Sequence, residues 1–194
     1  MKHRQRLVLT MLEDVLAALD RSSLVDQIKV LTPDKRVADY AVALGTGTIE
    51  DQYDLGINES LAIATKHEIQ DRGGPPLLIL PVDIPLVKAS TIDAIISRLN
   101  GSSSPLVVIS PSRNGGTNAL LRNPPDIIPT RYGPNSSEAH VREAEKRGVR
   151  VEVYRAEDLE IDLDTPQDIH EFLRKKDSTR TLDYLESILQ AKTI

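Results

Sequence analysis

The stretch Leu77–Leu86 reads Leu-Leu-Ile-Leu-Pro-Val-Asp-Ile-Pro-Leu and decides the fold class of this chain. Its four leading apolar residues follow a Gly-Gly-Pro-Pro turn, and a short apolar run bounded by turn residues is typical of a strand buried on both faces in a parallel sheet. Asp83 comes at the end of this run, between two prolines. Ligands of open α/β sheets bind at the carboxyl ends of strands, so Asp83 is a candidate metal ligand. The alternative is an aspartate that only caps a turn.

The overall composition fits one domain that spans residues 1–194. Hydrophobic residues make up 40% of the chain and aromatic residues 3%, so aliphatic side chains must supply the core. A net charge of −5 and the scarcity of aromatic residues argue against nucleic acid as a partner. The absence of cysteine excludes disulfides and thiolate chemistry. With no apolar run long enough for a membrane and no visible signal peptide, the expected compartment is the cytoplasm.

Hydrophobic periodicity predicts helices that alternate with strands, which indicates an α/β protein with a largely parallel sheet. The predicted helices cover residues 4–20, 35–44, 58–72, 90–99, 136–147, 166–175 and 181–191. The predicted strands cover 25–31, 77–81, 106–109 and, near an edge, 149–154, with a short extended segment at 119–121. Segment 48–58 is expected to be irregular. Asn58, Ser90 and either Ser136 or Ser137 are the expected N-caps.

Three carboxylates form the first candidate constellation. Asp162 and Asp164 are two residues apart in an extended segment, so their side chains point the same way. Together with Asp83 they make a plausible Mg²⁺ site, because Mg²⁺ prefers oxygen ligands and binds a few carboxylates, water and substrate phosphates. The alternative is that Asp164 or Thr165 merely caps the helix that begins at Pro166, and that Asp162 is solvated.

Two loops form the second constellation, and each can accept an anion. In Gly115-Gly116-Thr117-Asn118, paired glycines let backbone N–H groups converge and Thr117 adds a hydroxyl donor. Tyr132-Gly133-Pro134-Asn135-Ser136 leads into a helix N-terminus, and His140 lies four residues after Ser136 on the same side. Each loop alone is more simply an ordinary turn. Together with three carboxylates, they suggest a site that holds two phosphorylated molecules and a metal. The chain has no Gly-x-Ser-x-Gly elbow, His-Glu-x-x-His motif or Walker loop.

These blocks, in this order and at this spacing, resemble the 2-phospho-L-lactate guanylyltransferase family of deazaflavin coenzyme F-420 biosynthesis. The resemblance rests on four blocks: Pro81–Leu86, Gly115–Leu121, Tyr132–Ser136 with His140, and Asp162–Pro166 with Asp168. It implies a nucleotide-diphospho-sugar-transferase-like, Rossmann-like three-layer sandwich with a mostly parallel mixed sheet. It also implies transfer of GMP from GTP to 2-phospho-L-lactate or phosphoenolpyruvate with release of diphosphate, and often a homodimer.

The resemblance also implies roles for particular residues. Asp83, Asp162 and Asp164 would hold Mg²⁺ and serve catalysis. Thr117, Asn118, Gly133, Ser136 and His140 would lie at the phosphorylated acid. Gly56, Asn58, Ser60 and Pro81 would lie by the nucleotide, although the segment 51–55 is less glycine-rich than this family pattern. No protein nucleophile is required, because the acceptor's phosphate oxygen attacks the α-phosphorus of GTP directly.

The chain departs from the family pattern at its start, where members open with a strand and a basic loop that grips the triphosphate. Here Met1 falls at the following helix, so we expect the central first strand to be missing from the sheet. A chain that truly starts at Met1 is expected to bind GTP poorly and to have low stability. Two alternatives stay open: a nucleotidyltransferase with another acceptor, such as molybdopterin or a sugar phosphate, and a non-catalytic nucleotide-binding relative.

Overall fold

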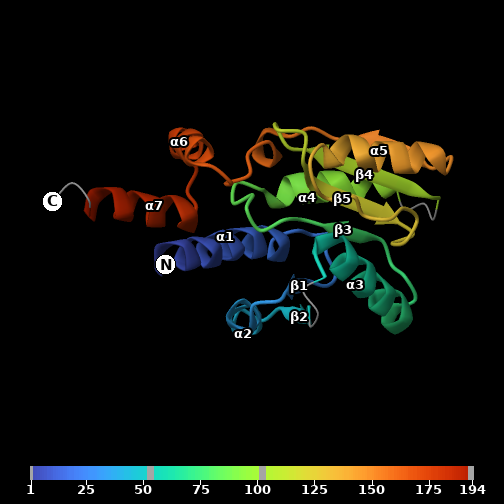
Figure 1. Cartoon of the computed structure of the whole chain (residues 1–194), viewed down its shortest axis with the longest axis horizontal. Coiled ribbons are helices and arrows are strands. Elements are labelled where there is room, and N and C mark those ends of the chain that lie inside the picture. The colour runs from blue at the N-terminus through green and yellow to red at the C-terminus, as the bar shows by residue number, and fades with distance from the viewer. Residues whose placement is uncertain (1, 52–54, 101–103, 192–194) are drawn as a thin grey trace.

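The computed structural model describes residues 2–51, 55–100 and 104–191 (Figure 1). Its helices are α1 (Lys2–Asp20), α2 (Lys35–Ala43), α3 (Ile57–Arg72), α4 (Ala89–Ile96), α5 (Ser136–Lys146), α6 (Pro166–Lys175) and α7 (Arg180–Ala191). Its strands are β1 (Lys29–Thr32), β2 (Gly47–Glu50), β3 (Leu77–Ile79), β4 (Leu106–Pro111), β5 (Thr117–Asn123) and β6 (Arg150–Val153). Short 3₁₀ turns cover Ser97–Leu99 and Glu157–Leu159. Within these residues, no helix has the length and apolarity that crossing a membrane requires.

The described strands form two separate sheets. β1 and β2 pair in parallel, and the second sheet has the order β3-β5-β4-β6. In that second sheet only β5 runs against its neighbours, so β3, β4 and β6 share one direction and the sheet is mixed but mostly parallel, as predicted. In this arrangement β1 has a ladder partner only in β2, and β3 only in β5.

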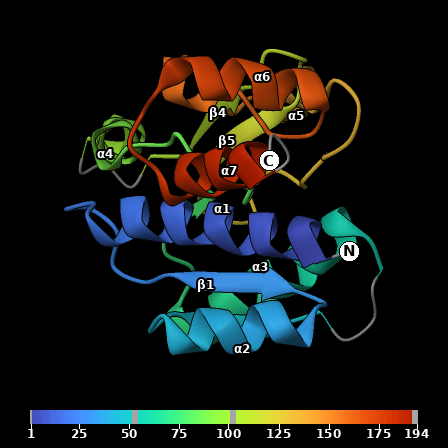
Figure 2. The same cartoon turned by 90° about the vertical axis from the view of Figure 1, so that its left-hand side faces the viewer.

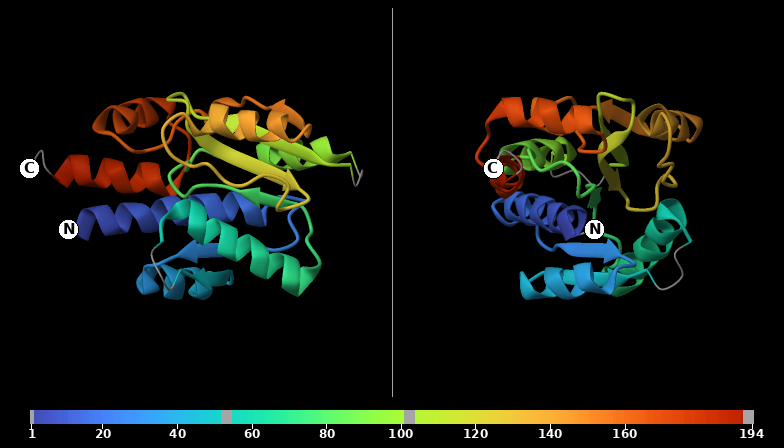
Figure 3. Two further views of the ribbon diagram at one scale, coloured as in Figure 1. Left: turned by 45° about the vertical axis from the view of Figure 1, so that its right-hand side comes forward. Right: turned by 60° about the vertical axis from the view of Figure 1, so that its left-hand side comes forward.

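Helices cover both faces of the four-stranded sheet, which gives the predicted three layers (Figure 3). β4 is buried along its whole length, and alternate residues face opposite sides. Leu106 and Val108 pack toward α1 and α4, whereas Val107 and Ile109 pack toward α5. Because both faces are covered, β4 carries the continuous apolar pattern that is typical of a central strand.

Helix α1 connects the two sheets by packing, since no ladder joins them. Its residues enter three apolar clusters: Val15 and Ala18 pack on the four-stranded sheet, Met11 packs near α7, and Leu12 and Leu16 pack on β1 and α2. Figure 2 shows α1 lying between α7 on one side and β1 with α2 on the other. The Asp14 carboxylate also accepts hydrogen bonds from the Arg180 and Thr181 N–H groups at 2.9 Å, and so caps the start of α7.

Several sequence-based boundaries need correction. Segment 48–58 was predicted to be irregular, yet Gly47–Glu50 forms strand β2, because pairing with β1 satisfies its backbone groups. Strand β1 begins at Lys29 and does not include residues 25–28. The N-caps of α3, α4 and α5 are Gly56, Lys88 and Asn135, so the predicted caps Asn58, Ser90 and Ser136 or Ser137 are wrong. For Asn58 and Ser136, the reason is that their side chains bond to other elements.

Strand β3, at the start of the Leu77–Leu86 stretch, also differs from its prediction in one respect. Both faces of β3 are covered as predicted, because Leu78 packs with the α1–α4 side and Ile79 with the α5 side. The strand is nevertheless half-buried, and it pairs antiparallel with β5. The cause is its place at the edge of the four-stranded sheet, where one side of its backbone has no neighbouring strand.

The packing role of α1 predicts a large penalty for Leu16→Ala. This side chain is 7% exposed at the junction with β1 and α2, so its truncation is expected to lower the free energy of unfolding by about 2–4 kcal/mol. Leu189→Ala is the matched control, because Leu189 is also helical but 51% exposed. Its effect should stay below about 1 kcal/mol. Urea unfolding of both variants tests this, and equal effects would contradict a bridging role for α1.

Candidate functional site

The structure brings the three predicted carboxylates to one region. Asp83 follows β3, and Asp162 and Asp164 lie in the segment that leads to α6. A backbone hydrogen bond from the Leu163 N–H to the Asp83 carbonyl, 2.9 Å long, joins the two segments. Since Leu163 lies between the two other aspartates, this bond places both beside Asp83.

The electrostatics of Asp83 are those of a crowded, poorly solvated carboxylate. Burial, together with the nearby charges of Asp164 and Asp162, raises the pKa of Asp83 to about 6. Its Oδ1 atom is buried and has no hydrogen-bond partner among the residues that the structure describes. Burial also raises the pKa of Asp162. A buried anionic oxygen without a donor is costly, so the arrangement favours a bound cation or proton at this place.

Asp164 was expected to be either a metal ligand or the N-cap of α6, and the start of α6 distinguishes these two roles. Thr165 is the N-cap, and it forms a reciprocal capping box with Asp168. Asp164 is exposed and is not used as the cap. The three aspartates do not form a closed cage: among the described residues, no three His, Cys, Asp or Glu side chains are grouped closely enough to hold a metal ion by themselves. A cation here would need ligands from water or substrate as well.

The glycine-rich loop is a tight turn between β4 and β5. The Gly115 N–H donates to the Ser112 carbonyl at 3.1 Å, and the Gly116 N–H donates to the Ser112 hydroxyl at 3.0 Å. Gly115 has a φ of +82°, which favours glycine, and a Cβ at Gly116 would lie 2.8 Å from the Ser112 hydroxyl. These glycines therefore shape the turn, and both N–H groups are already used within it.

Behind this turn, three side chains form a buried polar cluster. The Thr117 hydroxyl lies 2.9 Å from the Ser136 hydroxyl and 3.0 Å from Nδ1 of His140. The Ser137 hydroxyl donates to the Gly115 carbonyl at 2.9 Å, which holds the start of α5 against the β4–β5 turn. The two loops that the sequence singled out as anion sites are thus adjacent in space.

The hydrogen bonds assign the tautomer of His140. Its Nε2 accepts from the Arg131 backbone N–H at 2.8 Å, so the proton of the neutral ring sits on Nδ1 and is donated to Thr117. Burial, with the Arg122 and Arg131 charges, lowers the pKa of His140 to about 4, so the ring is neutral near pH 7. Thr117 accepts the hydrogen bond from this Nδ1–H, and in the bond between the Thr117 and Ser136 hydroxyls either oxygen can be the donor.

The start of α5 offers less to an anion than the sequence suggested. The Ser136 N–H donates to the Gly133 carbonyl at 3.1 Å, and the Ser137 N–H donates to the Gly115 carbonyl at 3.2 Å. Gly133 itself is exposed, with φ +143°, and nothing lies within 4 Å of the place of a Cβ. The Ser137 hydroxyl is likewise used by the Gly115 carbonyl, and Ser136 is buried, so fewer donors are free here than the sequence suggested.

Asn118 and the predicted nucleotide-side residues also have definite places. The Asn118 amide donates to the Leu159 carbonyl at 2.9 Å and holds the segment that leads to Asp162. Gly56, exposed with φ +88°, starts α3, and the Ser60 hydroxyl donates to Asp51 and contacts the Gly56 carbonyl. Asn58 bonds to the Tyr132 backbone, and Pro81 is half-buried between β3 and Asp83.

Sequence reasoning missed two arginines. Arg113, in the β4–β5 turn, pairs with Glu171 of α6, and its charge acts on Asp162. Arg122 in β5 is 2% exposed and donates to the Ile128 carbonyl at 2.9 Å and to the Thr65 hydroxyl at 2.8 Å. The available signal for Arg122 was a single arginine within the apolar strand Ala119–Asn123.

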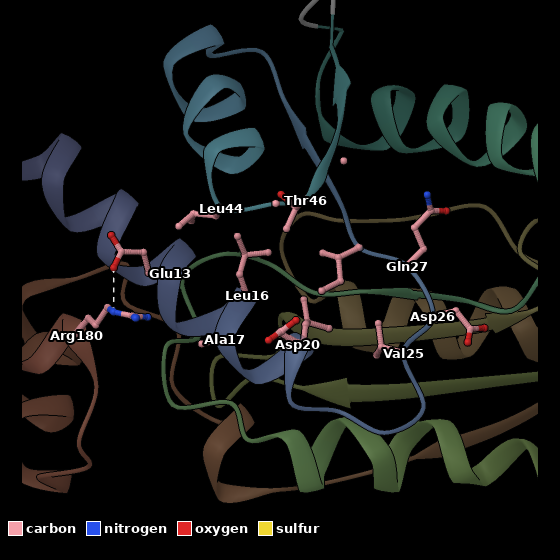
Figure 4. A pocket seen from close by; sticks show the side chains of 14 residues that line it. Glu13, Leu16, Ala17, Asp20, Val25, Asp26, Gln27, Leu44, Thr46 and Arg180 are labelled. Carbon is pink, nitrogen blue, oxygen red and sulfur yellow. Dashed lines mark ion pairs between the residues drawn. The ribbon is translucent and has the colours of Figure 1, made fainter.

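A cavity of about 530 Å³ lies away from these residues (Figure 4). It is bounded by α1, by the segment before β1 and by the turn between α2 and β2. It therefore sits at the amino ends of β1 and β2, and no candidate site residue lines it. Because ligands of this fold class bind at the carboxyl ends of strands, we assign the site to the Asp83–Ser136 region and not to this cavity.

Comparisons with known proteins agree with the arrangement. Residues 1–192 match a family described as guanylyl transferase CofC like. The chain is 34% identical to 2-phospho-L-lactate guanylyltransferase of Methanocaldococcus jannaschii, over 96% of this chain and 79% of that one. It is 34% identical to phosphoenolpyruvate guanylyltransferase of Sphaerobacter thermophilus, over 87% and 79%. A putative nucleotide-diphospho-sugar transferase from Desulfovibrio desulfuricans G20 superposes with a TM-score of 0.77 at 18% identity, over 96% and 83%, and shows the same fold.

The raised pKa of Asp83 predicts how Asp83→Asn changes stability with pH. The folded chain holds this proton up to about pH 6 and the unfolded chain only to about pH 4, so the wild type loses stability as pH rises between these values. Asparagine does not titrate in this range, so the variant does not lose stability in this way. In EDTA, the unfolding free energy of the variant minus that of the wild type should therefore increase by about 2–3 kcal/mol from pH 4 to pH 8. Urea titrations measure it, and a constant difference would contradict the assignment.

The hydrogen bonds of His140 predict its tautomer in solution. Nitrogen NMR of the labelled protein at pH 7 should show a protonated Nδ1 and an unprotonated Nε2, because Nε2 accepts from a backbone N–H. The ring should remain neutral down to about pH 5, since its pKa is lowered to about 4. A protonated Nε2 at pH 7 would show that the Arg131 contact is not formed.

Proposed function

The chain belongs to the guanylyl transferase CofC-like family, and from this premise we propose that it transfers GMP from GTP to a phosphorylated three-carbon acid and releases diphosphate. The acid is 2-phospho-L-lactate or phosphoenolpyruvate, the two that name its relatives' activities in the F-420 pathway. The observation that carries the proposal is the junction of Asp83 with the Asp162–Asp164 segment beside the Thr117–Ser136 hydroxyl pair.

The acceptor side of the site is assigned to the hydroxyl pair and its loop. A phosphate is a strong hydrogen-bond acceptor, so it requires donors that point outward. Because Nδ1–H of His140 donates to Thr117, the Thr117 hydroxyl can donate to Ser136, and in this arrangement the Ser136 proton is available to the acid's phosphate. His140 is fully buried, so it acts as a positioning residue behind the hydroxyls. Gly133, open and without a Cβ, allows the acid to approach the backbone.

The carboxylate side is assigned to Mg²⁺ on the chemistry of its donors. Asp83, Asp162 and Asp164 offer only oxygen, and the buried Oδ1 of Asp83 has no hydrogen-bond partner in the described part of the chain. Because the described residues provide no closed cage, the remaining ligands would be water and phosphate oxygens, as is usual for this ion. When bound, Mg²⁺ supplies neutralisation of negative charge on the reacting phosphates.

The chain's own part in the reaction is to position two anions. A phosphate oxygen of the acid attacks the α-phosphorus of GTP and forms a new P–O bond. The bond from the α-phosphorus to the bridging oxygen breaks, and diphosphate leaves with the electron pair. No covalent intermediate with the protein is required, so alignment and charge stabilisation account for catalysis. The loop around Ser136 holds the attacking phosphate, and the start of α3, with Gly56 and Ser60, is assigned to the nucleotide.

Removing one carboxylate tests the metal assignment. Asp83→Ala and Asp164→Ala are each expected to abolish Mg²⁺-dependent transfer while the fold survives, because the ion loses a ligand but the backbone bonds remain. Circular dichroism checks the fold, and calorimetry measures Mg²⁺ and nucleotide binding. Asp71→Ala, exposed near the end of α3, is the control and should behave as the wild type. Unchanged Mg²⁺ and nucleotide binding in both site variants would refute the assignment.

An assay of diphosphate release identifies the acceptor. GTP is supplied with Mg²⁺ and with 2-phospho-L-lactate, with phosphoenolpyruvate, or with neither acid. We expect release above background only with one of the two acids, because the acid's phosphate supplies the oxygen that attacks the α-phosphorus. Release that does not depend on either acid would indicate another acceptor or simple hydrolysis. ATP in place of GTP tests the base preference in the same format.

A further inference from the structure

The loop that precedes Ser136 is held in place almost wholly by side chains from other elements. Between β5 and α5, residues 124–135 form neither helix nor strand. The Arg122 guanidinium fixes this loop at the Ile128 carbonyl, and His140 fixes it at the Arg131 N–H. The position of the loop therefore follows the elements that supply these contacts.

Helix α3 supplies the contacts nearest to the candidate acceptor site. The Asn58 amide donates to the Tyr132 carbonyl at 2.9 Å, and its oxygen accepts from the Tyr132 N–H at 2.7 Å. The Thr130 hydroxyl donates to the Asn58 carbonyl at 3.3 Å. One asparagine thus satisfies both backbone groups of Tyr132, as a neighbouring strand would, directly before Gly133.

The same residue stands at the start of the helix assigned to the nucleotide. Asn58 is the second residue of α3, two residues after Gly56 and two before Ser60. Both polar atoms of its side chain are used by Tyr132, so its amide is not free for a nucleotide without breaking these bonds. Arg122 adds a second link between the loop and α3, through Thr65. Any displacement of the start of α3 is therefore transmitted to the acceptor loop.

We propose that Asn58 is a positioning residue that couples nucleotide binding to acceptor binding, by clamping the Tyr132–Ser136 loop to the N-terminus of α3. This inference rests on the proposed function. A nucleotide that orders the start of α3 also fixes the loop through Asn58, so the acid then binds to a loop that is already ordered. By reciprocity, the acid raises the affinity for the nucleotide by the same factor.

Calorimetry can measure this coupling directly. The probes are phosphoenolpyruvate and a GTP analogue with a methylene between the α- and β-phosphorus, both with Mg²⁺. In the wild type, saturating analogue should lower the Kd of phosphoenolpyruvate by about 5-fold or more. In Asn58→Ala the ratio should fall to less than about half of its wild-type value, because only the Arg122–Thr65 link then joins the loop to α3. The Kd for each ligand alone should change less than the ratio does.

A matched control separates coupling from general damage. In Asn123→Ala, a buried side-chain amide also loses its bond to a backbone carbonyl, but that bond joins the end of β5 to Ser104 before β4 and not to α3. This variant should keep the wild-type coupling ratio. Asn58→Ser is a second variant, small and compatible with a helix start, in case Asn58→Ala does not fold. The Arg122 link remains in both, which favours folding.

The outcomes separate failure of the inference from failure of the proposed function. If both probes bind the wild type and the ratio is 1, the proposed function survives and the coupling is refuted. If the ratio persists in the Asn58 variants, coupling exists but Asn58 does not carry it, and the inference is overturned. If neither probe binds the wild type with Mg²⁺ present, the proposed function fails and this inference fails with it.

Discussion

The packing of α1 is the constraint on which the rest of the structure depends. The two described sheets share no ladder, so their relative position is set by side chains and not by backbone hydrogen bonds. A single helix places Leu12 and Leu16 on one sheet and Val15 and Ala18 on the other. Burial of aliphatic side chains does not by itself favour one orientation. Because the buried residues of α1 lie on adjoining faces of the helix, their burial fixes how the two sheets are placed. The carboxyl ends of β3 and β4, where the candidate site lies, belong to the second of these sheets, and Val82 directly after β3 packs in the same cluster as Leu12 and Leu16.

At these carboxyl ends, the structure divides polar groups into two sides. The carboxylate side carries the poorly solvated carboxylate of Asp83, whose pKa is raised by burial and by the charges of Asp164 and Asp162. The hydroxyl side is electrically neutral, because burial keeps His140 uncharged. A neutral donor chain suits an anion that is bound and released in each turnover, whereas an arginine would hold it more strongly. The contrast between the two sides is consistent with a metal on one and a phosphate on the other.

Much of the fold could be predicted because its signals are local. Seven helices were predicted close to their observed positions, since amphipathic spacing and features such as Pro166 act within a few residues. Strand β2 was missed because Gly47–Glu50 has little apolar pattern and depends on its partner β1. The N-caps were wrong for a related reason. Asn58 and Ser136 are good capping residues by type, but each makes a long-range bond instead.

The sequence by itself determined the α/β class, the order of the elements and which motifs belong to a family of guanylyltransferases, because these follow from short patterns read along the chain. Only the tertiary structure decided what those residues touch. It placed Leu163 on Asp83, turned the glycine N–H groups inward and gave the Asn58 amide to Tyr132. The physical reason is that a polar group bonds to whichever partner the folded backbone brings within about 3 Å, and in this site the partners come from distant parts of the chain.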